Sequence, residues 1–539
     1  MSDGFQTGFV GSGPGFEENA SHMRGLLDDL RGLMGRARAA STASAPRFTR
    51  RGQLLPRERL ALALDEGAPY LELCALAGYL RDTDDPAKSI PGTNGIAGIG
   101  YISGTRCLIV TDDSGIGAGA ARPMGGTKFL RLEEIALRQR LPFVHLVESA
   151  GANLLDYKVE DFVRGGALFA NLARLSAAGI PVIAVTHGSS TAGGAYMTGL
   201  ADTVIMVRGR AKAFLAGPPL LKAATGEVAT DEELGGAMMH ATVSGLTEYL
   251  AEDDVDAIRI LRDFVARLGW DRGEERPATG PAPRFSAEEL LGIMPKDGRK
   301  PVDMREVIAR IVDASDFLEY KPLYGPATVC AQARVHRHAV GLLTNNGPLD
   351  PAGANKATQF IQLCCQTGTP LVYLQNTTGY IVGTQSEREG MIKIGSKMIQ
   401  AVANAGVPQI TIVCGASYGA GNYGMCGRGL GPDFIFSWPG ARTAVMGAEQ
   451  AALTMAIVAE EAARARGMAP DDVAIAATRT RVIETFERQT SAFYTSGAVL
   501  DDGVIDPRDT RNVLGFTLDI CRAGRRRALS GLSFGVARM

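Results

Sequence analysis

Short runs of β-branched and other apolar residues alternate with longer amphipathic stretches along most of the chain. Residues 142–147 and 182–186 have the length and composition of buried strands, and each leads into a Gly, Ser and Thr-rich turn before a helical pattern. Strands that alternate with helices in this way predict an α/β fold with parallel pairing. Two further long helices are predicted at 450–467 and 473–493.

The second half of the chain repeats the first half. The block 142–151 recurs at 370–379, and the block 178–181 recurs at 405–408. Arg57, Glu58 and Asp65 likewise recur as Arg305, Glu306 and Asp313. Because the order and the spacing of the repeated blocks agree, the sequence predicts two equivalent domains.

The repeat also predicts where these domains begin and end. Residues 50–267 form the first domain and residues 301–539 the second, joined by a polar, Pro-rich linker at 268–300. Residues 1–49 are expected to form a helical preface, with a helix at 20–40 followed by a loop.

Composition excludes several classes of protein. The 539 residues are 45% hydrophobic and 21% charged, with a net charge of −2, so a nucleic-acid partner is not expected. No secretory signal and no apolar run long enough to span a membrane is expected, and acidic residues accompany the Arg-rich N-terminal segment, which favours the cytoplasm. The eight dispersed cysteines lack zinc-site spacing and are expected to be reduced, mostly buried thiols, with no metal.

Two overlapping motifs in the second half match known catalytic patterns. Gly415-Ala-Ser417-Tyr-Gly419 fits the nucleophile turn of α/β-hydrolases, although none of the six histidines follows Ser417. A histidine from elsewhere in the fold would still satisfy the geometry, so a hydrolase stays an alternative. The G-x-G-x-x-G match at 419–424 lacks the acidic residue expected about 20 positions later, and the first half does not repeat it, so a nicotinamide site is rejected.

The repeat aligns Gly193-Gly194 with Ala420-Gly421, each pair at a turn from a strand into a helix. Small residues at such a turn let a ligand approach two backbone amides at the positive end of the helix dipole. An oxyanion hole has this construction. The alternative interpretation is that the small residues only permit close packing of the helices.

Four segments resemble the carboxyltransferase (β) subunit of biotin-dependent acyl-CoA carboxylases, in the branch of the 3-methylcrotonyl-CoA and geranyl-CoA enzymes. The similarity extends from about residue 50 to the C-terminus. The segments are Gly188–Tyr196, Phe214–Glu227, Ser417–Arg428 and Asp501–Arg511.

The resemblance implies two crotonase-like domains, each a ββα superhelix. It implies that Gly193 and Gly194 hold the thioester oxygen of the acyl-coenzyme A, and that Ala420 and Gly421 hold the ureido oxygen of biotin. It further implies a separate α-subunit with biotin carboxylase and biotin-carrier functions. The active site would lie between the first domain of one subunit and the second domain of another, in a trimer of dimers within an α6β6 enzyme.

The remaining candidates follow from the same motifs. Gly165 stands where the methylcrotonyl branch has a bulky aromatic residue, which implies room for a longer acyl chain, as in the geranyl branch, and Gly166 beside it is a further candidate on the acyl side. The other candidates are Ala195, Tyr196 and Lys222 on the acyl side and Tyr418, Gly419, Asn422 and Tyr423 on the biotin side. Arg208, Arg210 and Lys212 are candidates for the phosphates of coenzyme A or for solvated surface charge. His187 is expected to be a hydrogen-bonded core residue.

Two alternatives to a carboxylase subunit remain. One is a decarboxylase subunit of the same superfamily, which has the same fold and both holes. The other is a non-catalytic scaffold that binds coenzyme A thioesters. A biotin carboxylase is not expected, because no ATP-binding segment and no A-M-K-M biotinylation motif is present.

Overall fold

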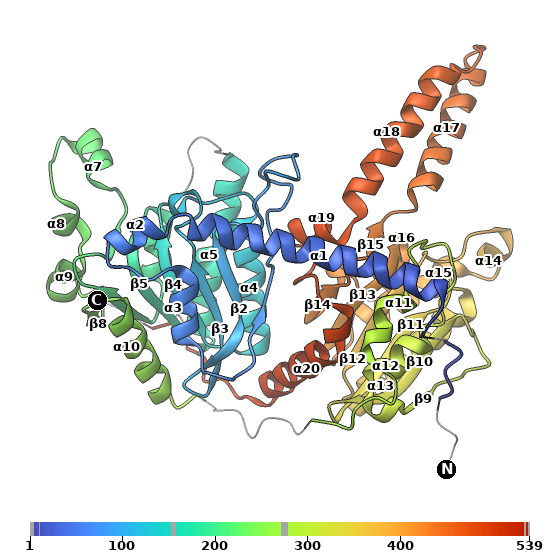
Figure 1. Ribbon diagram of the computed structural model, residues 1–539, viewed down its shortest axis with the longest axis horizontal. Coiled ribbons are helices and arrows are strands. Elements are labelled where there is room, and N and C mark those ends of the chain that lie inside the picture. Colours follow the sequence, from blue (N-terminus) through green and yellow to red (C-terminus); the bar gives the residue numbers. More distant parts are fainter. Residues whose placement is uncertain (1–4, 10, 152–157, 271–278, 533–534, 537–539) are drawn as a thin grey trace. The chain divides into compact units, whose positions relative to one another are not determined.

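The computed structural model describes residues 5–9, 11–151, 158–270, 279–532 and 535–536 (Figure 1). The chain divides into two compact units. One unit comprises Gly32–Arg276, Gly497–Val499 and Ile520–Met539, and the other comprises Met1–Arg31, Pro277–Ser496 and Leu500–Asp519. Each unit is built around one β-sheet with helices, so the predicted α/β class and the duplication are confirmed.

The first unit contains a sheet with the strand order β1-β2-β3-β4-β5-β6-β8, and β7 pairs with the carboxyl end of β5. Strands β1 to β3 are antiparallel, and β3 to β6 and β8 are parallel. The strands are β1 Leu71–Glu72, β2 Gly95–Ile102, β3 Thr105–Asp112, β4 Phe143–Ser149, β5 Val182–Thr191, β6 Thr203–Val207, β7 Lys212–Phe214 and β8 Tyr249–Ala251. The helices are α2 Ala45–Arg50, α3 Pro56–Ala63, α4 Gly125–Gln139, α5 Val159–Ala177, α6 Gly193–Gly199, α7 Pro218–Thr225, α8 Asp231–Gly235, α9 Ala237–Met239 and α10 Asp254–Arg267.

The second unit repeats this arrangement with the order β14-β13-β12-β11-β10-β9, and β15 pairs with the carboxyl end of β13. The strands are β9 Phe317–Glu319, β10 Thr328–Val335, β11 His338–Asn345, β12 Leu371–Thr377, β13 Gln409–Tyr418, β14 Phe434–Ser437 and β15 Arg442–Ala444. The helices are α11 Leu290–Ile293, α12 Arg305–Ile311, α13 Pro351–Thr367, α14 Thr384–Arg388, α15 Met391–Ala403, α16 Gly419–Gly424, α17 Ala448–Ala465, α18 Asp472–Thr490 and α19 Ala492–Gly497. Helices α1 Pro14–Thr42 and α20 Thr510–Arg526 contribute residues to both units, and the last residue of α19, Gly497, belongs to the first unit.

Equivalent hydrogen bonds hold the repeated blocks in place. The carboxylate of Asp65 accepts from the backbone amides of Ser103 and Gly104, at 2.8 and 2.6 Å, in the turn between β2 and β3. Asp313 accepts from the amides of residues 336–337, at 2.9 and 2.8 Å, in the turn between β10 and β11. The repeated aspartates are therefore structural, because each satisfies two amides of a tight turn that have no strand partner.

Most predicted elements are confirmed, with one correction near the N-terminus. The helices predicted at 450–467 and 473–493 are α17 and α18, which form an antiparallel hairpin (Figure 1). The loop predicted after residue 40 is wrong, because 45–50 form α2, whose first turn accommodates Pro46. Residues 287–293 of the predicted linker are also helical, and Leu290 and Leu291 are buried.

The eight cysteines are free thiols, and all except Cys365 are buried. Among the described residues, no group of three or more His, Cys, Asp and Glu side chains is arranged to hold a metal ion. Every helix in the described part of the chain is too short or too polar to cross a lipid bilayer.

We expect Glu133→Gln to stabilise the subunit increasingly as the pH rises. Glu133 lies buried in α4, where one carboxyl oxygen accepts from Asn171 of α5 at 3.1 Å and burial raises the pKa to about 8. The folded pKa of this carboxyl exceeds its ordinary value of 4.5. Between pH 4.5 and about 8, the free energy of unfolding therefore falls by about 1.4 kcal/mol for each pH unit. Melting temperatures of both proteins should agree near pH 4.5 and diverge toward pH 8. Parallel melting curves across this range would contradict the assignment.

Candidate functional site

The first candidate turn lies at the carboxyl end of β5. Ala192 follows the last strand residue with φ 55° and ψ −118°, and its amide donates to the carbonyl of Phe214 in β7 at 3.1 Å. Gly193 and Gly194 then begin α6. The first amides of a helix have no acceptor within that helix, so the two glycines present backbone donors at this position.

The second candidate turn has the same construction at the end of β13. Tyr418 pairs with Ala444 of β15 as Thr191 pairs with Phe214 of β7. Gly419 has φ +55°, which matches Ala192 and is a conformation that favours glycine. Ala420 and Gly421 therefore occupy the positions of Gly193 and Gly194, and the predicted alignment of the two turns is present in the structure.

The neighbouring strand crowds each turn to a different degree. A Cβ on Gly194 would lie 3.4 Å from the side chain of Ser149, which is ordinary contact. A Cβ on Gly421 would lie 2.9 Å from Cα of Gly379, so the backbone would have to move. Close packing therefore accounts for the glycine at 421 but not for the one at 194, where a small side chain fits.

Ser417 lies just before the second turn but is completely buried. Its hydroxyl donates to Oε1 of Gln375 at 2.5 Å and accepts from Nδ2 of Asn422 at 2.8 Å. A hydrolase nucleophile must be exposed to substrate, so the hydrolase alternative is wrong for this serine. Ser417 and Asn422 instead brace the turn. The equivalent Ser190 does so by donating to the carbonyl of Gly194 at 2.8 Å.

Comparison with known proteins identifies the family. The model of the carboxyl transferase domain matches residues 48–530. The chain belongs to the carboxyl transferase family. A probable biotin-dependent acyl-coenzyme A carboxylase beta2 subunit of Mycobacterium tuberculosis is 49% identical over 97% of this chain and 98% of its own. A probable mitochondrial methylcrotonoyl-CoA carboxylase beta chain of Drosophila melanogaster is 43% identical over 97% and 93%.

A solved structure agrees with these sequences. The geranyl-CoA carboxylase beta subunit of P. aeruginosa has a TM-score of 0.92 and 50% identity, with 99% of this chain and 100% of that chain covered. The protein is thus the carboxyltransferase β-subunit of a biotin-dependent acyl-CoA carboxylase. It acts on a coenzyme A thioester, with the biotin carried by a partner α-subunit.

On the acyl side of this carboxyltransferase, α5 approaches the first turn. The ring of Phe169 lies 5.7 Å from the ring of Tyr196, and a Cβ on Gly193 would lie 3.6 Å from the edge of Phe169. Gly165 precedes Phe169 by four residues, which places both on one face of the helix. A Cβ on Gly165 or Gly166 would have no heavy atom within 4 Å. Sequence reasoning missed Phe169, although its spacing from Gly165 was a usable signal.

The basic candidates near the carboxyltransferase turn differ in their contacts. Lys212 pairs with Asp231, and Arg208 pairs with Glu252 at 3.2 Å. Lys222 projects from α7 with an exposed side chain. Arg210 lies 4.0 Å from Asp254, so the three cations at 208, 210 and 212 each have an acidic partner. Lys222 is an exposed candidate for a phosphate.

A buried ionic cluster lies beneath the first turn. His187 is buried in β5, and its Nδ1 lies 3.0 Å from Asp254, so the predicted core histidine is confirmed. Burial and the nearby guanidinium of Arg59 lower the pKa of His187, although Asp254 opposes this. Arg59 itself bridges Glu148 at 2.6 Å and Asp254 at 3.0 Å. Sequence reasoning missed this cluster.

Proposed function

We propose that this β-subunit transfers a carboxyl group from carboxybiotin to a branched enoyl-CoA such as geranyl-CoA or 3-methylcrotonyl-CoA. The observation that carries the proposal is the pair of equivalent turns, each with two helix-starting amides. Two substrates that each develop a negative oxygen require two such sites. The names of the similar proteins, the methylcrotonoyl-CoA and geranyl-CoA carboxylases, support this class of acyl group.

On the acyl side, the amides of Gly193 and Gly194 hold the thioester oxygen and stabilise the negative charge that it gains when the γ-carbon loses a proton. Backbone donors fixed at a helix start need no reorganisation during this step. Ala195 and Tyr196 line the turn, since the tyrosine ring stacks edge-on against Phe169. Gly165 and Gly166 leave space for the acyl chain, and Lys222 meets a phosphate of coenzyme A.

On the biotin side, the amides of Ala420 and Gly421 hold the ureido oxygen. The chain fits this group, because Gly419 provides the left-handed turn and Tyr418 and Asn422 fix its position. The exposed ring of Tyr423 offers an apolar surface for the biotin rings. Biotin, when bound, supplies the carboxyl group and, through its freed nitrogen, the base for the acyl-CoA.

The proposed domain roles follow the repeat. Residues 50–267 bind the acyl-CoA and 301–539 bind biotin, with 1–49 as a preface and 268–300 as a linker. The working enzyme is a cytoplasmic homo-oligomer of β-subunits, a trimer of dimers, which assembles with the α-subunit as α6β6.

The test mixes the purified β-subunit with its α-subunit, ATP, bicarbonate and a panel of acyl-CoAs, and follows ADP release. We expect release that depends on a branched enoyl-CoA. Consumption of a carboxylated thioester without ATP would favour the decarboxylase subunit. Binding of acyl-CoAs without turnover in either assay would favour the non-catalytic scaffold.

The Gly165→Phe variant is expected to shift the preference from geranyl-CoA toward 3-methylcrotonyl-CoA. A ring on the face of α5 that carries Phe169 would fill the open space beside the first turn. The ratio of kcat/KM values for the two substrates measures the shift, which we expect to be roughly 10-fold or more, since a filled pocket excludes methylene groups worth 1–3 kcal/mol. Ala167→Phe, on the opposite face of α5, is the control. Equal ratios in both variants would contradict the pocket assignment.

A further inference from the structure

The two halves share a second tight turn that the reaction does not use. After β1, the amide of Ala77 donates to the carbonyl of Cys74 at 3.1 Å, and Cys74 has φ 51°. After β9, the amide of Tyr324 donates to the carbonyl of Lys321, also at 3.1 Å, and Lys321 has φ 50°. Residues 74–78 and 321–325 are therefore equivalent in the duplicated fold.

The first of these turns is covered by another segment of its own unit. Cys74, Leu76 and Ala77 are completely buried or nearly so. The amide of Gly78 donates to the carbonyl of Gly497 at 2.8 Å, and a Cβ on Gly497 would overlap the backbone of Tyr79. The segment Gly497–Val499 thus docks directly on the turn.

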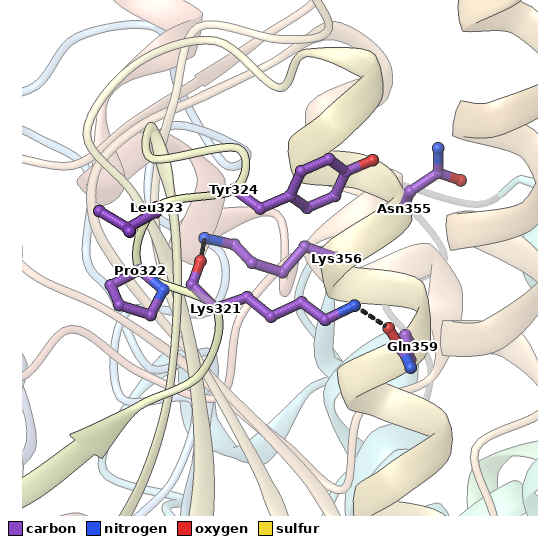
Figure 2. A pocket seen from close by; sticks show the side chains of 7 residues that line it. All are labelled: Lys321, Pro322, Leu323, Tyr324, Asn355, Lys356 and Gln359. Atoms are coloured by element: carbon purple, nitrogen blue, oxygen red, sulfur yellow. Dashed lines mark hydrogen bonds between the residues drawn. The ribbon is translucent and has the colours of Figure 1, made fainter.

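The second turn is open. Leu323 is 95% exposed and Tyr324 is 47% exposed, beside a hollow of about 640 Å³ between the turn and α13. Figure 2 shows that the ammonium of Lys356 points to the carbonyl of Lys321, whose own ammonium points to Gln359. These bonds tie the turn to α13. Both acceptors are neutral, so the ammonium groups keep their charge, and the hollow offers apolar side chains beside two cations.

The segment equivalent to 497–499 is open as well. Val499 has φ 57° and precedes Asp502, which accepts from the amide of Ile435 at 2.8 Å. Gly245 has φ 69° and precedes Glu248 by the same three residues, and Glu248 accepts from the amide of Val204 in the equivalent strand. Val243–Gly245 is therefore the counterpart of 497–499. Val243 is 79% exposed.

We propose that Val243–Gly245 of one copy of the chain docks on the turn at 321–325 of a second copy. Within the chain this contact is made once, between 497–499 and the turn at 74–78, while the equivalent segment and the equivalent turn are both exposed. In such a head-to-tail contact, each copy binds the next copy through two different surfaces. The copies form a closed ring when the rotation between neighbouring copies allows it. The exposed side chains of Val243, Leu323 and Tyr324 supply apolar surface on both partners.

This contact forms part of a larger interface in the β-subunit oligomer, because a stable interface buries roughly 1,200–2,000 Å². It does not depend on the identity of the acyl-CoA. Its test therefore measures association in the absence of substrate, and its failure would leave the carboxyltransferase assignment intact.

The first experiment measures the sedimentation velocity of the free β-subunit. Val243→Lys and Leu323→Glu, made separately, each place a charge in the apolar contact and are expected to shift the protein toward smaller species. In the Val243→Lys variant, repulsion between the new lysine and Lys321 adds to this effect. The double variant should restore the wild-type distribution through an opposite-charge pair. Val255→Lys, at an exposed position of α10, is the control, and melting curves verify that each variant is folded. Wild-type sedimentation of both single variants would overturn the proposal.

The second experiment identifies the partner as another copy. A chain with Val243→Cys and a differently tagged chain with Leu323→Cys are co-expressed and treated with a short bismaleimide. A covalent pair containing both tags is expected only when both variants are present, and the wild-type chain with its intermediately exposed Cys365 gives the background. A mixture that forms no pair above this background would overturn the proposal.

Discussion

Gly194→Val is expected to reduce carboxylation by the assembled enzyme by about 10²-fold or more while the subunit stays folded. The amide of Gly194 is one of two donors proposed for the thioester oxygen, and one such donor contributes about 10²–10³ in rate. The Cβ of valine would meet Ser149 at 3.4 Å, which the fold tolerates. The two methyl groups add bulk beside the amides that we propose to hold the thioester oxygen.

The measurement is ADP release with the α-subunit and the preferred acyl-CoA, together with the melting temperature of the free β-subunit. Gly199→Val in the same helix is the control, because a Cβ there meets no heavy atom within 4 Å. Turnover of the Gly194→Val protein at the wild-type rate would show that this turn takes no part in the reaction. If only Gly194→Val has a lower melting temperature, the loss of carboxylation would be explained by misfolding.

The repeat and its turns were predictable because they depend on local chemistry. A β-branched run followed by small residues specifies a strand and a strand-to-helix turn, and the same pattern at 182–194 and 409–421 produced the same backbone. The difference between the two turns was not predictable. Gly421 is crowded by Gly379, 42 positions away, and such proximity arises only when neighbouring strands pair.

The residues around the turns were harder to predict for the same reason. Arg59 meets Glu148 and Asp254 across 89 and 195 positions of sequence. As one of two arginines in a short helix, it resembles the many arginines that remain on the surface. Ser417 shows the opposite case, in which a motif suggested an exposed nucleophile and the fold buried it between Gln375 and Asn422.

Arg59→Met is expected to lower the free energy of unfolding of the first unit by about 3–5 kcal/mol, because breaking a buried ion pair leaves an uncompensated charge. The guanidinium is completely buried and bridges Glu148 and Asp254. Methionine of similar length would leave Glu148 without this cation and Asp254 with Arg210, at 4.0 Å. Glu148 directly precedes Ser149, the residue packed against Gly194. The destabilisation should therefore be accompanied by reduced turnover.

Thermal melting of the free β-subunit, followed by circular dichroism, measures the effect. Arg259→Met is the appropriate control, since Arg259 pairs with Asp256 and Asp263 on the exposed face of α10 and such surface pairs contribute about 0–1 kcal/mol. A melting temperature of Arg59→Met equal to that of Arg259→Met would contradict a structural role for the cluster. If only Arg59→Met loses stability, the charges beneath the first turn stabilise the carboxyl ends of β4 and β5, next to the turn that carries Gly193 and Gly194.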